Sequence, residues 1–355
     1  MSSVAASTLP IPAHFDESRV GDLWFVDYEN LAPQAEDWAK QHGIKSAAID
    51  KTKICVIPID VQLTFAHPQG GLPVAGAYDD CVRACKFIYE NMHLITSIAP
   101  TMDTHTVIQI FHQIFLVDDD GNHPTPGLPI EDADIQSGKW KVNPAVAHTI
   151  KGGNYMYLET YLRHYSKTLN TGSSAYRRYA LTPWPYHAIL GGLEHALIPL
   201  LHEAIFFHTV ARHNERKTQI KGGNPLTENY SPIQPDVLAD QDGTSIAQKK
   251  VGFLKLILDH DIIIGLGEAK SHCFAWFIND LLDEINQQDP SLVKKIYLLE
   301  DCTSPVVIPG QYPGDPPIYD ATPQADEAFE RFVNAGMHVV KSTTPIVDWP
   351  GVDID

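Results

Sequence analysis

One cysteine lies where its thiol could serve as a nucleophile. Cys273 follows the apolar run IIIGLG at 262–267 and opens a predicted helix at 271–285, with Ser271 expected at the N-cap. The partial positive charge at a helix N-terminus favours a thiolate over a thiol. Taken by itself, a cysteine in such a position is more often an inert core residue. Cys273 is therefore a candidate nucleophile whose role depends on partners elsewhere in the chain.

Carboxylates and imidazoles end two other strand-like runs. The apolar run ICVIPID delivers Asp60, and the run at 93–105 ends in Asp103 and His105. Asp103 and His105 alternate along an extended segment, which places both side chains on one side. In an open α/β sheet ligands bind at the carboxyl ends of the strands, so these residues are candidate site residues.

Three separated segments carry a resemblance to a known family. They are Asp60-Val-Gln62-Leu-Thr-Phe65 with Gly70-Gly-Leu-Pro73, then Lys221-Gly-Gly-Asn-Pro225-Leu-Thr-Glu-Asn-Tyr230-Ser231, then Gly267-Glu-Ala-Lys-Ser-His-Cys273. In this order they resemble motifs of nicotinamidases and pyrazinamidases, members of the isochorismatase-like cysteine hydrolase superfamily. The resemblance implies a three-layer α/β/α sandwich with a mostly parallel, doubly wound sheet.

The resemblance also implies roles for the matched residues. Cys273 would attack an amide carbonyl, Asp60 would move protons, and Lys221 would stabilise the thiolate and carboxylate charges. Backbone amides of Ala269 and Cys273 would form the oxyanion hole, within a turn shaped by a cis peptide between Glu268 and Ala269. Considered singly, Asp60 could instead cap a helix and Lys221 could lie in solvent.

A metal site is implied by a further match. Nicotinamidases supply a metal ligand from a Trp-Pro-x-His segment, which Trp184-Pro-Tyr-His187 resembles. With Asp103 and His105, His187 would hold Zn²⁺ as first choice, with Mn or Fe as alternatives. In that family the metal would bind the pyridine nitrogen of the substrate. The competing interpretation is that these are ordinary surface histidines.

The match also departs from the family pattern. Ala188 stands where a cysteine usually follows the Trp-Pro-x-His histidine, and His112 lies farther along than the corresponding family histidine, so it stays unassigned. Glu268 and Lys270 replace small and apolar turn residues. We expect these two charges to pair with each other or to contact substrate, so nicotinamide specificity is a hypothesis.

The elements that must position these residues alternate between strand and helix. Helices are predicted at 77–92, 155–165, 191–213, 245–259, 271–285 and 325–336, and strands at 54–60, 93–105, 218–221, 261–267, 294–301 and 338–343. This alternation favours a parallel doubly wound sheet. Four histidines of the 191–213 stretch are interpreted as core or surface residues, not ligands: His195, His202, His208 and His213.

The predicted organisation is an N-terminal arm at 1–50 and a cysteine hydrolase domain at 51–355. Within that domain, residues 113–180 are rich in Pro, Gly and acids, and we interpret them as an insertion that forms a lid or an oligomer contact. A homo-oligomer is one consequence of this interpretation.

Bulk composition excludes several classes of partner. The 355 residues carry a formal charge of −18, which disfavours nucleic acid and anionic membranes. Neither a signal peptide nor about 18 consecutive apolar residues occur, so a cytoplasmic location is expected. Five cysteines in a chain this large favour reduced thiols.

Three functions are carried forward. The first is hydrolysis of a small aromatic carboxamide, nicotinamide preferred, to the acid and ammonia through a Cys273 thioester, with Phe65, Trp184 and Tyr230 as aromatic walls. The second applies the same chemistry to another small amide, ureido or carbamoyl substrate. The third is a non-catalytic metal-binding or interaction protein, against which the complete set of Asp60, Lys221 and Cys273 argues.

Overall fold

The computed structural model describes residues 8–172, 177–308, 310, 312 and 314–354. Residues 1–7 of the predicted arm and 173–176 of the predicted insertion lie outside the described residues. The chain forms two compact units. Unit 1 comprises Met1–Met102, Ala196–Gln219 and Val251–Asp355, and unit 2 comprises Asp103–His195 and Ile220–Lys250.

A five-stranded parallel sheet lies at the centre of unit 1, in the order β11-β8-β7-β1-β2. Its strands are β1 (Ile54–Ile59), β2 (Ser97–Ile98), β7 (Ile262–Gly267), β8 (Ile296–Leu299) and β11 (His338–Val340). All six residues of β1 and of β7 are buried, which explains why both read as unbroken apolar runs. The parallel doubly wound sheet expected from the sequence is confirmed.

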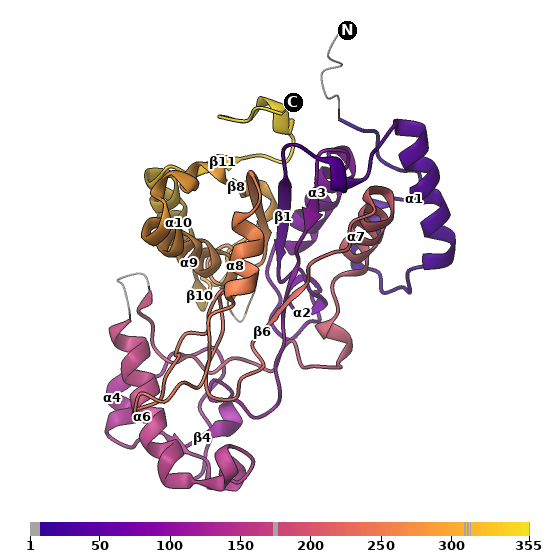
Figure 1. The fold of residues 1–355 in the computed structure, drawn as a ribbon. Helices are drawn as coiled ribbons and strands as arrows, with labels where there is room; N and C mark the ends of the chain where they lie inside the picture. The colour runs from indigo at the N-terminus through magenta and orange to yellow at the C-terminus, as the bar shows by residue number, and fades with distance from the viewer. Residues whose placement is uncertain (1–7, 173–176, 309, 311, 313, 355) are drawn as a thin grey trace. The chain divides into compact units, whose positions relative to one another are not determined.

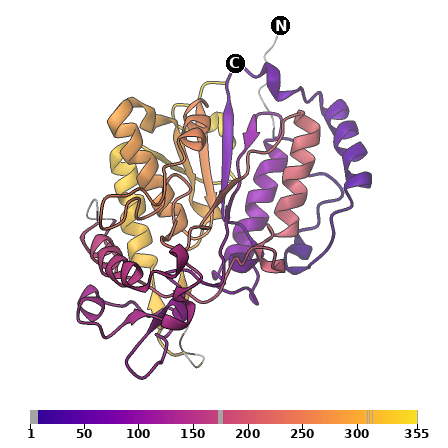
Figure 2. The ribbon, with the colours of Figure 1, turned by 60° about the horizontal axis from the view of Figure 1, so that its bottom comes forward.

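Helices cover both faces of this sheet (Figures 1 and 2). α3 and α7 pack together on one face, while α9 and α10 pack together on the other. The helices of unit 1 are α1 (Tyr28–His42), α2 (Leu63–Ala66), α3 (Ala77–Glu90), α7 (Pro199–Arg212), α8 (Val251–Leu258), α9 (Cys273–Gln288) and α10 (Thr322–Ala335). A two-stranded antiparallel sheet adds β9 (Val307–Ile308) and β10 (Tyr319–Asp320).

The predicted arm contains a helix that sequence patterning did not indicate. In α1, Asp27 caps the N-terminus by accepting from the Asn30 amide, and Gly43 ends the helix in a left-handed conformation with φ 65°. Its buried residues, Leu31, Ala35 and Ala39, recur every four positions, and α1 packs against α7. Two of the three are alanines, so the apolar stripe is too weak to be recognised from sequence alone.

Unit 2 is built from short elements around one longer helix. They are α4 (Asp132–Gln136), α5 (Pro144–Ala147), α6 (Tyr155–Thr171), and the antiparallel pair β4 (Leu116–Val117) and β5 (Lys141–Val142). The chain enters the unit in β3 (Thr101–Asp103) and again in β6 (Gln219–Lys221), and these two strands pair with each other. The predicted insertion at 113–180 lies inside this unit, and α6 confirms the helix expected there.

Several predicted boundaries were wrong for local reasons. The run at 93–105 forms β2 and β3 instead of one strand, because Pro100 between them lacks an N–H to donate. The helix expected from residue 191 begins only at Pro199, which occupies the first helical turn. Ser271 is not an N-cap: α9 begins at Cys273 with His272 as cap, while the Ser271 hydroxyl accepts from the Val306 amide at 3.0 Å.

Among the described residues, none of the helices combines the length and apolar character needed to cross a membrane.

Candidate functional site

Asp60 is held by a threonine at the end of β1. The residue is fully buried and has a positive φ of 48°, so the chain turns sharply as it leaves the strand. The Asp60 amide donates to Thr101 Oγ1 at 3.0 Å, and that hydroxyl donates to Asp60 Oδ1 at 2.5 Å. The carboxylate is thereby fixed in one orientation. Thr101 is a supporting residue that sequence reasoning did not single out.

Cys273 is the first residue of α9 and is 7% exposed. The turn before it folds back on itself, because the amides of His272 and Phe274 donate to the Ala269 carbonyl at 2.9 and 3.2 Å. The peptide bond between Glu268 and Ala269 is cis, as the resemblance implied. The thiol therefore lies at a helix N-terminus, where a thiolate is favoured.

Asp60 and the turn before Cys273 follow two neighbouring strands, β1 and β7, that pair with each other. β1 pairs with β7 so that Ile59 stands opposite Gly267, and the Glu268 amide donates to the Ile59 carbonyl at 2.7 Å. Gly267 has φ +105°, and a Cβ there would lie 2.3 Å from the Ile59 carbonyl oxygen. Only glycine permits the two strand ends to approach this closely. Unit 1 thus brings the acid and the nucleophile-bearing turn to one edge of the sheet.

Of the two alternatives for Glu268 and Lys270, the structure excludes the one in which they pair with each other. The Lys270 ammonium lies 3.2 Å from Asp326 Oδ1 and 4.5 Å from the centre of the Phe329 ring. Glu268 is 1% exposed and faces Asp80 of α3 instead.

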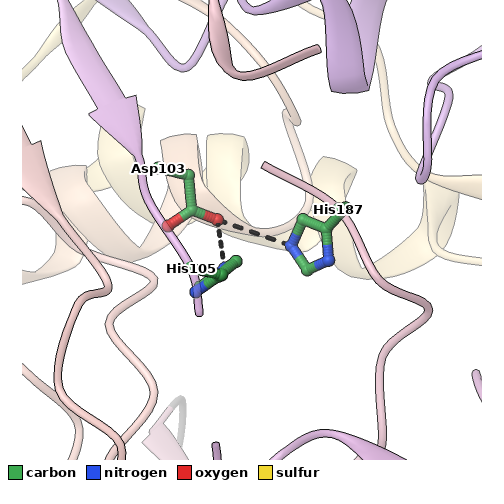
Figure 3. A group of neighbouring side chains, drawn as sticks. All are labelled: Asp103, His105 and His187. Carbon is green, nitrogen blue, oxygen red and sulfur yellow. Dashed lines mark hydrogen bonds and ion pairs between the residues drawn. The ribbon is translucent and has the colours of Figure 1, made fainter. Parts of the chain in front are cut away.

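Unit 2 contains the predicted metal ligands in one cluster. Asp103, His105 and His187 are buried, and one ligand atom from each lies within 4.8 Å of the others (Figure 3). Asp103 Oδ2 lies 2.8 Å from Nε2 of His105 and 3.5 Å from Nε2 of His187. The three residues are therefore close enough for a single cation to contact them all.

The outer nitrogens of both imidazoles indicate what this cluster can hold. Nδ1 of His105 lies 3.2 Å from the Gly222 carbonyl, and Nδ1 of His187 lies 2.7 Å from the Pro185 carbonyl. A neutral imidazole has one proton, so donation from Nδ1 leaves a lone pair on each Nε2. Both lone pairs then face Asp103 Oδ2, an arrangement that requires a positive charge among the three atoms. Histidine metal ligands commonly use this outward hydrogen bond to a carbonyl.

The pKa shifts indicate the charge of Asp103 within this cluster. Burial lowers the pKa of His105, although the Asp103 carboxylate opposes that shift. Burial also opposes ionisation of Asp103, but the adjacent His105 and Lys221 outweigh it and hold the Asp103 pKa well below its usual value. A carboxylate beside two imidazole nitrogens is a donor set that fits Zn²⁺, Mn²⁺ or Fe²⁺.

Lys221 forms an ion pair within the same unit. Its Nζ lies 3.0 Å from Asp103 Oδ1, and its side chain is 1% exposed. The next residue, Gly222, has φ +89°, and a Cβ there would lie 2.6 Å from Asp103 Oδ1 and 2.9 Å from His105 Cε1. Glycine at this position is thus what allows the lysine loop to reach the carboxylate. The interpretation of Lys221 as a solvent-exposed residue is excluded.

Two further residues near the cluster were missed or left unassigned. Gln109 is fully buried and donates to the carbonyls of Gly222 and Asn224 at 2.7 and 3.0 Å, which ties the lysine loop to the segment after the ligands. His112 is also fully buried, 5.8 Å from His105 between ring centres, and its Nε2 has no hydrogen-bond partner among the described residues. Apart from residue type, no sequence pattern indicated that Gln109 or His112 lies near the cluster.

The proposed aromatic walls divide between the units. Phe65 belongs to α2 of unit 1 and is 6% exposed. In unit 2 the Trp184 indole N–H donates to the Tyr230 hydroxyl at 2.7 Å, and the two rings meet edge to face at 88°. Burial raises the Tyr230 pKa well above its usual value, so the hydroxyl stays protonated.

Other histidines form hydrogen bonds within the fold, and the cysteines are buried. His195 hydrogen-bonds to Thr104 Oγ1 at 2.8 Å, His202 to the Tyr28 hydroxyl at 2.7 Å, and His208 to the Ile95 carbonyl at 2.9 Å. All five cysteines are buried, and among the described residues no disulfide joins any of them. Burial raises the pKa of Cys55 to about 12, so that thiol is inert at neutral pH.

Comparison with known proteins finds likeness among solved structures. No family model matches the chain, and no curated protein sequence matches it. An Acinetobacter baumanii nicotinamidase and pyrazinamidase is 18% identical, covering 83% of this chain and 98% of that chain, with a TM-score of 0.48. The yeast nicotinamidase bound to the inhibitor nicotinaldehyde is 16% identical over 81% and 99%, with a TM-score of 0.49.

A third similar structure is the N-carbamoylsarcosine amidase of Thermoplasma acidophilum. It is 11% identical, covering 83% of this chain and 99% of that chain, with a TM-score of 0.38. At these identities none of the three establishes a substrate for this chain.

Proposed function

We propose that this protein is a cysteine amidohydrolase that converts a small aromatic carboxamide, nicotinamide in the first instance, to the acid and ammonia. The observation that carries the proposal is the register of β1 with β7, which brings Asp60 and the turn of Cys273 to one sheet edge. A buried carboxylate beside a thiol at a helix N-terminus is the pairing that a nucleophile with its own proton acceptor requires.

The proposed reaction has two halves. Asp60 takes the proton of Cys273, and the thiolate attacks the amide carbonyl while backbone amides of Ala269 and Cys273 stabilise the oxyanion. Asp60 then gives the proton to the leaving nitrogen, which departs as ammonia and leaves a thioester. In the second half Asp60 takes a proton from water as the water attacks the thioester carbon. The C–S bond then breaks, the acid leaves, and Asp60 returns the proton to the Cys273 sulfur.

Unit 2 supplies the remaining groups of the proposal. Lys221 is the proposed cation that stabilises the thiolate and carboxylate charges. Asp103, His105 and His187 would hold the divalent metal, and Trp184 and Tyr230, with Phe65 of unit 1, would contact the aromatic ring. When bound, the metal supplies open coordination positions for water or for a heteroatom of the substrate.

Ammonia release from nicotinamide and a panel of small amides tests this proposal. We expect Cys273→Ala and Asp60→Asn to lower kcat/KM by about 10⁴-fold or more, because both act in the same step. Cys55→Ala is the matched control, since it removes a buried thiol whose pKa is raised to about 12. Wild-type turnover in the Cys273 variant would contradict the mechanism, and turnover only of a ureido or carbamoyl compound would reassign the substrate.

A further inference from the structure

Two buried carboxyl groups face each other behind the nucleophile turn. Glu268 of the turn is 1% exposed and Asp80 of α3 is 3% exposed, and both contact Ser304, whose hydroxyl donates to Asp80 Oδ2 at 2.5 Å and whose amide donates to Glu268 Oε2 at 3.4 Å. Two buried carboxylates that share a neighbour repel each other when both are ionised, which favours a proton on one of them.

The surrounding donors identify which carboxyl is the acid. Both oxygens of Asp80 already accept hydrogen bonds, Oδ1 from Arg83 at 2.6 Å and Oδ2 from the Ser304 hydroxyl at 2.5 Å. Among the described residues, Glu268 Oε2 accepts only from the Ser304 amide, at 3.4 Å, and Oε1 has no donor. A proton on Glu268, donated to Asp80, satisfies the buried oxygen that otherwise has no partner. We propose that Glu268 is a protonated acid whose hydrogen bond to Asp80 positions the turn that carries the Ala269 amide and the Cys273 thiol.

The charged and titratable groups around the pair agree with this assignment. From α3 they are Asp80, Cys81 and Arg83, and from the segment after β8 they are Asp301 and Cys302. Arg83 is the one cation among them, and it binds Asp80 and the Asp301 carbonyl. Burial, followed by the charge of Asp80, raises the Glu268 pKa well above its usual value. One cation thus faces the carboxyl groups of Asp80, Asp301 and Glu268, so a proton on Glu268 reduces the negative charge that Arg83 leaves uncompensated.

The link from Glu268 to catalysis runs through the backbone. The turn is fastened to the 303–306 segment at three further points: Thr303 Oγ1 donates to the Gly267 carbonyl, the Lys270 amide donates to the Ser304 carbonyl at 2.8 Å, and the Val306 amide donates to Ser271 Oγ at 3.0 Å. Glu268 adds the only one of these contacts that reaches α3. Its side chain begins one bond before the peptide that presents the Ala269 amide, so it fixes where that amide points. Glu268 is thus a positioning residue whose catalytic consequence rests on the proposed function.

Thermal unfolding across pH 5 to 9 tests the protonation without any substrate. A folded-state pKa above the unfolded value of 4.5 means that the folded protein holds one extra proton between the two values, so wild-type stability falls as pH rises through that window. Glu268→Gln keeps a donor to Asp80 and removes the titration. We expect the melting temperature of Glu268→Gln relative to wild type to rise with pH. A difference that is constant with pH, or that falls, overturns the assignment.

Turnover and labelling test the positioning. We expect Glu268→Ala to lower kcat about 10- to 100-fold with little change in KM, and Glu268→Gln to restore most of it. Lys270→Ala, which removes the side chain two residues along the same turn, is the matched control and should stay within about twofold of wild type. Equal effects of Glu268→Ala and Lys270→Ala would overturn the positioning role.

The two proposals fail separately. If wild-type protein releases no ammonia from any amide, the proposed function is wrong, while the rate of iodoacetamide labelling of Cys273 still reports the turn. In that case we expect Glu268→Ala to change the labelling rate at least about threefold and Glu268→Gln to leave it near wild type. Unchanged labelling in Glu268→Ala overturns the inference.

Discussion

Gly222 shows how a single missing side chain can determine a site. Its backbone lies against Asp103 and His105, and its carbonyl accepts hydrogen bonds from His105 Nδ1 and Gln109 Nε2. The lysine loop and the ligand cluster therefore form one hydrogen-bonded unit. A change at this position should disturb Lys221 and the imidazoles together.

Gly222→Ala and Gly223→Ala make a matched pair of variants. A Cβ at 222 would meet Asp103 Oδ1 at 2.6 Å with φ +89°, whereas a Cβ at 223 meets nothing within 4 Å. We expect Gly222→Ala to weaken Zn²⁺ binding about 10- to 100-fold and Gly223→Ala to leave it near wild type. Metal content after dialysis against a graded series of free Zn²⁺ measures this. Equal retention by the two variants would remove the case for a metal at Asp103.

At the scale of elements, α1 is attached to unit 1 by a small apolar stripe. Ala35 is fully buried on that stripe, and its neighbour Glu36 is exposed. The contact of α1 with α7 extends the face of the sheet that α3 and α7 cover. The N-terminal segment is therefore part of the folded unit rather than a loose covering.

Introducing aspartate at Ala35 and at Glu36 in separate variants compares a buried position with an exposed one on the same helix. Ala35→Asp puts an unpaired carboxylate into the α1 interface, and we expect it to lower the free energy of unfolding by about 2 to 4 kcal/mol. Glu36→Asp introduces the same residue on the exposed face and should change it by less than about 0.5 kcal/mol. Urea denaturation followed by circular dichroism measures both. If Ala35→Asp is as stable as Glu36→Asp, the helix does not pack as described.

The elements that sequence predicted well are those whose signal is local. Unbroken apolar runs gave β1 and β7, and 3.6-residue periodicity gave α3, α6 and α10. Local signals also gave candidate ligands at strand ends, because period-two alternation placed Asp103 and His105 together. Boundaries set by proline were misjudged where the apolar pattern continued through the residue, as at Pro100 and Pro199.

The remainder depends on contacts between distant segments. Glu268 and Asp80 are 188 residues apart, and no pattern links an acid in a turn to an acid on a helix face. The Lys221 ion pair with Asp103 and the Thr101 clamp on Asp60 are likewise tertiary. The residue types of the site were predictable from the sequence. The partners of those residues were not, because they come together only in the folded structure.

For the whole molecule, buried histidines make stability depend on pH. Burial lowers the pKa of His14, His208 and His272 to about 4, from an unfolded value of 6.5. Between these values the unfolded chain binds more protons than the folded one, so stability falls as pH falls from 6.5 to 4. Fully buried His208 contributes up to about 1.4 kcal/mol per pH unit in that window, and the half-buried His14 and His272 contribute less.

His208→Gln isolates one of these contributions. The amide can still donate to the Ile95 carbonyl, which lies 2.9 Å from His208 Nε2 in the wild type, but it does not titrate. We expect the fall in unfolding free energy between pH 6.5 and pH 4 to be smaller in the variant by about 1 to 3 kcal/mol. Urea titrations at a series of pH values test this. Parallel pH dependences for variant and wild type would show that folding does not lower the pKa of His208.

The pairing of β1 with β7 also has a consequence for synthesis on the ribosome. The hydrogen bond that joins Lys53 to Asp261 at the start of this pair spans 208 residues of chain. At about 5 to 20 residues per second, β1 waits roughly 10 to 40 s for its neighbour. During that interval its fully apolar strand has an open edge, which is the kind of surface that aggregates or recruits chaperones. The same pairing that aligns Asp60 with the Cys273 turn thus makes the nascent protein vulnerable until its last third has emerged.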